Sequence, residues 1–455
     1  MNKIEKTGQW SWKYAVLRFF VKTAFCIYYR SIHITGRNNI SKGGRLIFAA
    51  NHQNGLMDPL AILSTNSYQP VFLARADIFK KPFIARILRF LKIMPVYRLR
   101  DGVPAMEQNE DTFIRTTSVL ASGGCIGIMP EGNHSGQKRL RSLKKGIFRI
   151  AFRAEEFLKD YNQEVKIVPV GLDFSDISEF RGDLVVNYGK PISISSYLEL
   201  YTRYPQKAIN KIKEDLAGSL QSLMIHIKDE KNYENDKLLV DIGTELMESG
   251  YAGKHPGSYK KFLLGREFCQ AMYDYFEKNP DTAEKLRSKS YGFSELTKSR
   301  NVKTGSTERK GKKQILFLSV MRLLYYPVFL AGSLLHLIPV ILIHNFLKRI
   351  SDPGFISTYK FVLGVLLVSL NYVGIGLVAM TLFSLEYAVL LVAILPLSGL
   401  LGHRCYRFSN RLKEVIHFNQ VCNKDRTFTE KIFKLKSAIV KELEPIMRNA
   451  EAGLK

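Results

Sequence analysis

Two side chains suited to proton transfer lie six residues apart near the beginning of this chain. They are His52 and Asp58, within the run NHQNGLMDP at residues 51–59. A neutral imidazole near pH 7 can take a proton from a hydroxyl, and a nearby carboxylate would fix its tautomer and stabilise the imidazolium that forms. The chain has no G-x-S-x-G pattern for a serine nucleophile, so the pair indicates direct transfer.

The spacing of this pair excludes a shared helical face. At about 100° per residue, positions 52 and 58 would lie roughly 120° apart around a helix. A contact therefore needs an irregular loop, for which Gly55 offers unrestricted backbone angles. Alternatively, Asp58 only begins a helix, because Asp followed by Pro59 is a common helix start.

Short apolar runs alternate with helical patterns from about residue 36 to residue 196. The runs at residues 44–50, 125–129 and 165–170 predict buried strands. Helices are predicted between them, at residues 59–64, 82–91 and 140–158. This alternation predicts an α/β domain, with His52 directly after its first buried strand.

The His52 segment resembles the Asn-His-x-x-x-x-Asp signature of the glycerolipid acyltransferase family, with one extra residue between His and Asp. That longer spacing resembles fungal-type glycerol-3-phosphate acyltransferases. Three further segments occur in the order of the family's blocks: MPVYR at 94–98, MPEGNHS at 129–135 and IVPV at 167–170. In the third block, Asn133 and His134 stand where the family usually has Thr and Arg.

The resemblance covers roughly residues 36–190 and implies a mixed-sheet acyltransferase domain that uses an acyl thioester of CoA or acyl carrier protein, with no other cofactor. It implies that His52 is the general base and that Asp58 supports it. The fourth block is associated with binding of the acyl donor. The residues expected to bind substrate are Asn51, Arg98, Glu131, Gly132, Asn133, Lys138 and Pro169.

Basic residues near these blocks suit a phosphorylated acceptor. Arg98 and a cluster formed by Lys138, Arg139, Arg141, Lys144 and Lys145 could surround a phosphate. The alternatives are a solvated charged face for the cluster and a plain turn for Glu131 and Gly132. His134 matches no catalytic position of the family. No metal is expected, because the histidines lack metal-ligand spacing.

The net charge of +26 implies an anionic partner. Apolar residues are concentrated at 315–346 and 361–401, so a bilayer is a simpler partner than nucleic acid, for which no module is evident. The second stretch divides at Ser384 to Glu386 into a hairpin of two crossings. The first stretch would then be re-entrant or bent. Basic flanks predict a cytosolic active site, in a bacterial inner membrane or the endoplasmic reticulum.

Five consecutive segments are predicted from these patterns. They are an interfacial helix (1–35), the acyltransferase domain (36–196), a helical segment and basic linker (197–313), membrane-embedded helices (314–403) and a helical tail (404–455). The amphipathic stretch at 13–29 could instead pack on the protein's own core. Five cysteines without framework spacing predict neither disulfides nor a zinc site.

These features predict a membrane-bound enzyme that transfers a fatty acyl group to a hydroxyl of glycerol 3-phosphate. Lysophosphatidic acid or another lysophospholipid is the alternative acceptor. A different class of function also fits the sequence: a non-catalytic membrane scaffold that binds anionic lipid through its basic surface.

Overall fold

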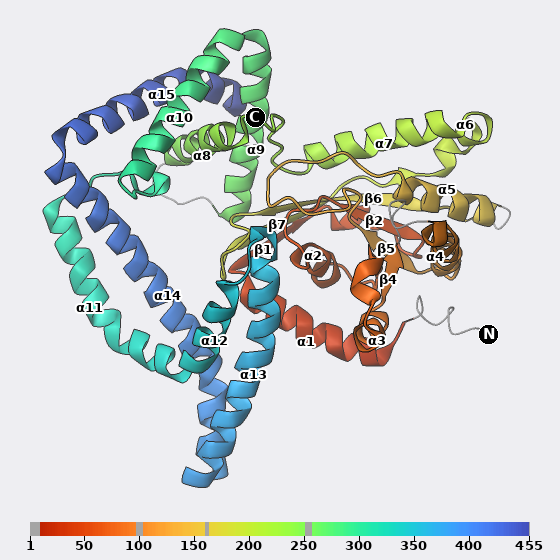
Figure 1. The fold of residues 1–455 in the computed structure, drawn as a ribbon, viewed down its shortest axis with the longest axis horizontal. Helices are drawn as coiled ribbons and strands as arrows, with labels where there is room; N and C mark the ends of the chain where they lie inside the picture. The colour runs from red at the N-terminus through yellow and green to blue at the C-terminus, as the bar shows by residue number, and fades with distance from the viewer. Residues whose placement is uncertain (1–9, 97–102, 160–162, 251–256, 455) are drawn as a thin grey trace. The chain divides into compact units, whose positions relative to one another are not determined.

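The chain is divided by its internal contacts into two compact units. The computed structural model describes residues 10–96, 103–159, 163–250 and 257–454 (Figure 1). The first unit comprises Met1–Lys228, Lys254–Arg266 and Asp352–Thr358, and the second comprises Asp229–Gly253, Glu267–Ser351 and Tyr359–Lys455. Both units are discontinuous in sequence, unlike the five consecutive segments that we predicted.

The first unit is built on an eight-stranded mixed sheet with the order β1-β7-β6-β2-β5-β3-β4, and β8 pairs with β6. Strand β6 is antiparallel to β7 and β8, and the other paired strands are parallel. The expected mixed α/β architecture is therefore present. The strands are β1 (Ser31–Thr35), β2 (Leu46–Ala50), β3 (Val71–Arg75), β4 (Ile93–Val96), β5 (Cys125–Ile128), β6 (Lys166–Phe174), β7 (Asp183–Tyr188) and β8 (Ile192–Ser193).

Helices cover both faces of this sheet, because its central strands are apolar on both sides. In Figure 1, α5 and α7 lie on one side and α1 and α2 on the other. Ile47 and Ala49 of β2 belong to the core beneath α5 and α7, whereas Phe48 points the opposite way, toward Tyr68 and Tyr188. The helices are α1 (Trp12–Tyr28), α2 (Met57–Thr65), α3 (Pro82–Phe90), α4 (Val103–Ala121), α5 (Gly146–Leu158), α6 (Leu198–Arg203) and α7 (Pro205–Ser222).

The helix predicted at residues 140–158 begins only at Gly146, so that prediction was wrong for its first six residues. The backbone N–H of Arg141 donates to the Glu131 side chain, and that of Lys144 donates to the carbonyl of Pro130. These bonds to the end of β5 hold the segment as a loop, overriding its helical pattern. The three predicted strands are present as β2, β5 and β6.

The second unit is helical. Helix α9 passes from the first unit into the second. Among the residues that the structure describes, three helices are long and apolar enough to cross a membrane: α11, the stretch Pro353–Leu382 that includes α13, and α14. The helices are α8 (Tyr233–Ser249), α9 (Ser258–Lys278), α10 (Pro280–Ser299), α11 (Lys312–Leu335), α12 (Leu337–Leu347), α13 (Ile356–Leu382), α14 (Leu385–Lys424) and α15 (Arg426–Gly453).

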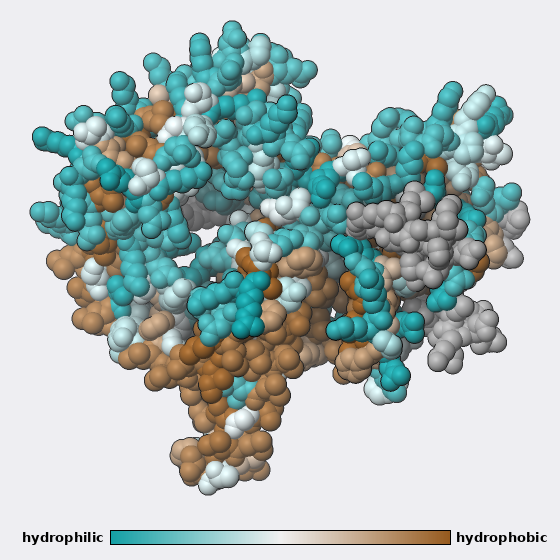
Figure 2. All heavy atoms as spheres, viewed as in Figure 1, coloured by the Kyte–Doolittle hydropathy of each residue, from teal (hydrophilic) through white to brown (hydrophobic). Residues whose placement is uncertain are grey.

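The predicted hairpin of apolar helices is present, because α13 ends at Leu382 and α14 begins at Leu385. Figure 2 shows apolar side chains covering its projecting end. The first apolar stretch is also broken, at His336 between α11 and α12. Helix α14 continues to Lys424, so the predicted boundary at residues 403/404 falls inside one helix.

Helices α11 and α14 cross where small residues allow a close approach. A Cβ on Gly332 would lie 2.3 Å from the carbonyl oxygen of Ser398 and 3.1 Å from Cα of Gly402. Small residues of this kind bring apolar helices together in lipid, where no hydrophobic effect drives their association. The structure thus supports a membrane protein with a packed helical region.

Candidate active site

Two loops meet at one edge of the sheet because β2 and β5 are neighbouring parallel strands. Ile47 pairs with Ile126 and Ala49 with Ile128, so both strands end at the same edge. His52 follows the end of β2, and Glu131 follows the end of β5. The Glu131 side chain accepts a hydrogen bond from the backbone N–H of His52, at 2.7 Å. The carboxyl edge of the sheet therefore brings the first and third motif blocks into contact.

The expected contact between His52 and Asp58 is present. Nδ1 of His52 lies 2.7 Å from Oδ2 of Asp58, whose side chain is fully buried. The same oxygen accepts hydrogen bonds from the backbone N–H groups of Gln53 and Asn54, at 2.9 and 2.8 Å. The loop bends at Gly55, where φ is +42°. An irregular loop, rather than a helical face, closes the six-residue separation.

Asp58 has a wider role than beginning a helix. Helix α2 starts at Met57, with Leu56 as its N-cap, so Asp58 lies within the first turn and its side chain reaches back to the preceding loop. A carboxylate can only accept, so Nδ1 of His52 carries the proton that it shares with Asp58. Nε2 of neutral His52 then has a lone pair. The His52 side chain is 16% exposed, so a substrate can reach it.

Glu131 fixes the backbone at this edge of the sheet. Its second carboxylate oxygen accepts from the backbone N–H of Arg141 at 2.9 Å, so the side chain ties the His52 loop to the loop before α5. Burial raises the pKa of this carboxyl to about 7, although the two backbone N–H donors lower the pKa by stabilising the carboxylate. Each oxygen accepts one backbone N–H group, so Glu131 positions the His52 loop in this structure, and its predicted role in substrate binding remains a prediction.

Asn51 and Pro169 lie in the framework behind the loop. The Asn51 amide exchanges two hydrogen bonds with the backbone of Leu172, at 3.0 and 2.7 Å, and so joins the end of β2 to β6. Pro169 is buried within β6, in register with Ala49. Their predicted roles in substrate binding remain predictions.

The loop after β5 carries the remaining predicted residues. Gly132 has φ of +78° and, like Asn133, is exposed. Both carboxylate oxygens of Asp173 accept from Nζ of Lys138 at 2.8 Å, whereas Arg141 and Lys144 are exposed. Within the predicted basic cluster, Lys138 is therefore paired, whereas the side chains of Arg141 and Lys144 face solvent.

Arg98 lies outside the described residues. Strand β4 ends at Val96, and it is parallel to β3, which is parallel to β5. The end of β4 therefore lies at the same edge of the sheet as the His52 loop. Within the described ranges, no group of three or more His, Cys, Asp or Glu side chains could hold a metal ion.

His134, Asp352 and Thr358 also lie at this site. Sequence reasoning considered His134 but gave it no role, and it missed Asp352 and Thr358. The rings of His134 and His52 have centroids 5.6 Å apart, and Nε2 of His134 lies 3.0 Å from Oδ2 of Asp352. The backbone N–H of Leu56 donates to Oγ1 of Thr358 at 3.1 Å. Asp352 followed by Pro353 signals a helix start in the sequence, but nothing local indicates what that start contacts.

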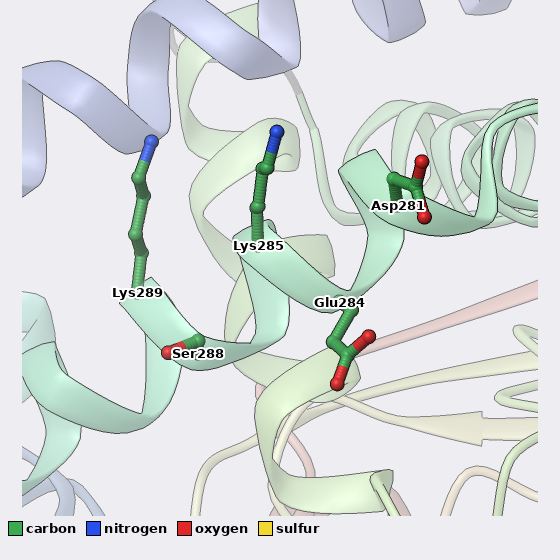
Figure 3. A pocket seen from close by; sticks show the side chains of 5 residues that line it. All are labelled: Asp281, Glu284, Lys285, Ser288 and Lys289. Carbon is green, nitrogen blue, oxygen red and sulfur yellow. The ribbon is translucent and has the colours of Figure 1, made fainter.

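A surface pocket in the second unit contains none of these residues. It lies on α10 and is lined by Asp281, Glu284, Lys285, Ser288 and Lys289 (Figure 3). Lys289 also pairs with Glu442 of α15. The lining side chains all come from one helix and carry both signs of charge, so this pocket suggests no specific ligand.

Comparison with known proteins places residues 31–173 in the acyltransferase family. Glycerol-3-phosphate O-acyltransferase 2 of Saccharomyces cerevisiae is 21% identical over 47% of this chain and 42% of its own length. Glycerol-3-phosphate O-acyltransferase 1 of the same yeast is 33% identical over 26% of this chain and 16% of its own length. The 1-acyl-sn-glycerol-3-phosphate acyltransferase of Borreliella burgdorferi is 24% identical over 47% of this chain and 80% of its own length. This chain thus spans less than half of the two yeast relatives.

Proposed function

We propose, on the premise that this chain belongs to the glycerolipid acyltransferase family, that it transfers a fatty acyl group from a thioester to a hydroxyl of glycerol 3-phosphate at a membrane. The observation that carries the proposal is the contact between Nδ1 of His52 and the buried carboxylate of Asp58. It leaves Nε2 as a base on an accessible ring at the carboxyl edge of the sheet.

In this mechanism, Nε2 of His52 takes the proton of the acceptor hydroxyl as its oxygen attacks the thioester carbonyl carbon. The tetrahedral intermediate then collapses, the carbon–sulfur bond breaks, and the leaving thiolate takes the proton back from the imidazolium. Asp58 stabilises the imidazolium between these steps. Glu131 holds the backbone of His52, and much of the rate comes from holding acceptor and donor together.

The acceptor's phosphate would bind at the exposed basic residues beside this loop. Arg141 and Lys144 support that role, because their backbones are fixed to the end of β5 while their side chains are exposed. Arginine can offer two parallel hydrogen bonds to phosphate oxygens. The names of the two yeast relatives favour glycerol 3-phosphate, and that of the Borreliella relative supports lysophosphatidic acid as the alternative.

We further propose that the active site faces the cytosol and that acyl-CoA or acyl carrier protein supplies the thioester. Basic residues before α11, between α12 and α13 and in the later part of α14 support this orientation by the positive-inside rule. In a background with Cys26 replaced by Ser, Ser384→Cys should react with an impermeant maleimide from outside intact cells. Arg349→Cys should react only after permeabilisation, and the opposite pattern would refute the orientation.

The test of the activity is transfer of labelled palmitoyl from CoA, by detergent-purified protein, to glycerol 3-phosphate and lysophosphatidic acid in parallel. His52→Ala should lose activity by about 10²- to 10⁴-fold, the usual contribution of a general base. His33→Gln is a matched control, because His33 lies on β1 and stacks on Tyr259.

Activity that survives in the control and vanishes in His52→Ala would establish the enzyme and name its acceptor. Wild-type protein inactive with both acceptors, from CoA and from acyl carrier protein, would contradict the proposal. The non-catalytic scaffold would then become the better explanation.

A further inference from the structure

A short segment far along the chain packs on the His52 loop. It is Asp352–Thr358, which contains a 3-10 turn (Pro353–Phe355) and the first residues of α13. It belongs to the same compact unit as the sheet, although Thr358 lies 302 residues from Leu56, which it contacts. It is also the start of a candidate membrane-spanning stretch, Pro353–Leu382.

The segment contacts the bend of the His52 loop directly. Oγ1 of Thr358 accepts the backbone N–H of Leu56 at 3.1 Å. A Cβ on Gly55 would lie 2.8 Å from that oxygen and 3.0 Å from the carbonyl oxygen of Gly354. The bend between His52 and Asp58 is therefore held by this segment as well as by the Asp58 side chain.

The segment also fixes His134 beside the catalytic histidine. Asp352 lies 3.0 Å from Nε2 of His134, and the ring of Phe355 meets the His134 ring edge-on, with centroids 4.4 Å apart. A Cβ on Gly354 would lie 2.3 Å from Cδ2 of His134, so only glycine allows this approach. His134 thus lies between the segment and His52, whose ring centroid is 5.6 Å away.

The segment is itself anchored to other parts of the first unit. The buried Ser357 hydroxyl donates to the carbonyl of Ile177 and accepts from the hydroxyl of Tyr28 at 2.9 Å. Tyr28 is the last residue of α1. These bonds connect the segment to two places away from the His52 loop, so it can act as a fixed support.

We propose that Asp352–Thr358 is a positioning segment, which holds the His52 loop and His134 in the arrangement that acyl transfer requires and links that arrangement to the start of a membrane-spanning helix. The inference rests on the proposed acyltransferase activity. Displacing a general base by about 1 Å can lower the rate about 10²-fold. Loosening the contacts of this segment with the His52 loop therefore lowers kcat more than it weakens substrate binding.

Two pairs of variants test the segment. Thr358→Val removes the hydroxyl that accepts from Leu56 and nearly keeps the volume, whereas Thr358→Ser keeps the hydroxyl. Gly354→Ala drives a methyl into the His134 ring, whereas Gly364→Ala places a methyl on α13, which follows that turn, with nothing within 4 Å. Each protein is measured for kcat, KM and Tm, and for hydrogen exchange of the peptide at residues 51–58.

We expect kcat to fall about tenfold in Thr358→Val and up to about 10²-fold in Gly354→Ala, with KM within about twofold of the wild-type value. Thr358→Ser and Gly364→Ala should keep the wild-type kcat. Exchange of the 51–58 peptide should rise in Thr358→Val, because the Leu56 amide loses its acceptor.

The segment has no positioning role if Thr358→Val and Gly354→Ala keep wild-type kcat, or if exchange of the peptide is unchanged in Thr358→Val. Losses of kcat and Tm in Gly364→Ala that equal those in Gly354→Ala would also overturn the proposal. Any disturbance of α13 would then be enough to lower kcat. Inactive wild-type protein would instead indicate failure of the proposed acyltransferase function, before any variant is compared.

Discussion

Replacing Asp58 by Asn tests whether the carboxylate acts through its charge or only through its shape. Oδ2 of Asp58 accepts from Nδ1 of His52 and from the backbone N–H groups of Gln53 and Asn54. The two backbone donors require an oxygen at that position, so Asn must place its carbonyl oxygen there. The loop and the His52 tautomer are then retained, the negative charge is lost, and the amide NH2 takes the buried position of Oδ1.

The size of the effect follows from the contact distance. With 2.7 Å between Nδ1 and Oδ2, the charge centres of imidazolium and carboxylate lie about 4 Å apart. At an effective dielectric constant of about 20, unit charges at that distance attract by about 4 kcal/mol. Each 1.36 kcal/mol is about tenfold in rate, so kcat should fall about 10³-fold in Asp58→Asn.

The assay is transfer of labelled palmitoyl from CoA to glycerol 3-phosphate at saturating substrate, with Tm as the control for folding. Asp58→Ala is the comparison, because it removes the acceptor of two backbone N–H groups and should lower both kcat and Tm. If Asp58→Asn keeps kcat within about threefold of wild type at unchanged Tm, the charge does not matter. Asp58 would then serve only to shape the loop.

Three further predictions concern titration and pairing. The pKa of buried Glu131 is raised to about 7 from 4.5, so the folded state holds the proton more tightly than the unfolded state. Protonation of Glu131 therefore stabilises the fold by at most about 3 kcal/mol. This contribution is complete below pH 4.5 and is lost as the pH rises through 7. The Tm of wild type relative to Glu131→Gln should therefore fall between pH 5 and 8, and a constant difference would contradict this. Burial lowers the pKa of Lys92 to about 8, so stability should rise between pH 8 and 10 in wild type but not in Lys92→Met, as followed by Tm. Lys138→Met should destabilise the fold by about 3 kcal/mol, because it leaves the buried carboxylate of Asp173 without its partner. The double variant Lys138→Met/Asp173→Asn should recover this stability. A higher KM at unchanged Tm in Lys138→Met would instead indicate that Lys138 binds phosphate.

The local part of the site could be predicted from the sequence. His52 and Asp58 follow a strongly apolar strand and are joined by a loop with a glycine, so their contact depends on a few consecutive residues. The meeting of the first and third blocks depends on β2 and β5 being neighbours, which the structure shows, because parallel neighbouring strands end at one edge of a sheet. These are short-range patterns and a general property of sheets.

The rest depends on contacts between distant residues. The loop at residues 140–145 has a helical pattern, but the Glu131 carboxylate and the Pro130 carbonyl capture its backbone N–H groups. The basic charge of Lys138 suggested phosphate binding, yet Asp173 of β6 already pairs with it. The docking of Asp352–Thr358 has no local signal, since its partners lie hundreds of residues earlier.

That docked segment has a consequence for how the protein is made. The bonds from Thr358 to Leu56, from Asp352 to His134 and from Ser357 to Tyr28 join residues 302, 218 and 329 positions apart. At about 5 to 20 residues per second, a ribosome needs roughly 11 to 66 s to advance from the first to the second partner of such a pair. The sheet can form during that delay, but the His52 loop acquires its last support only as the next membrane-spanning helix leaves the ribosome. Completion of the His52 loop is therefore coupled in time to insertion of this candidate membrane-spanning helix.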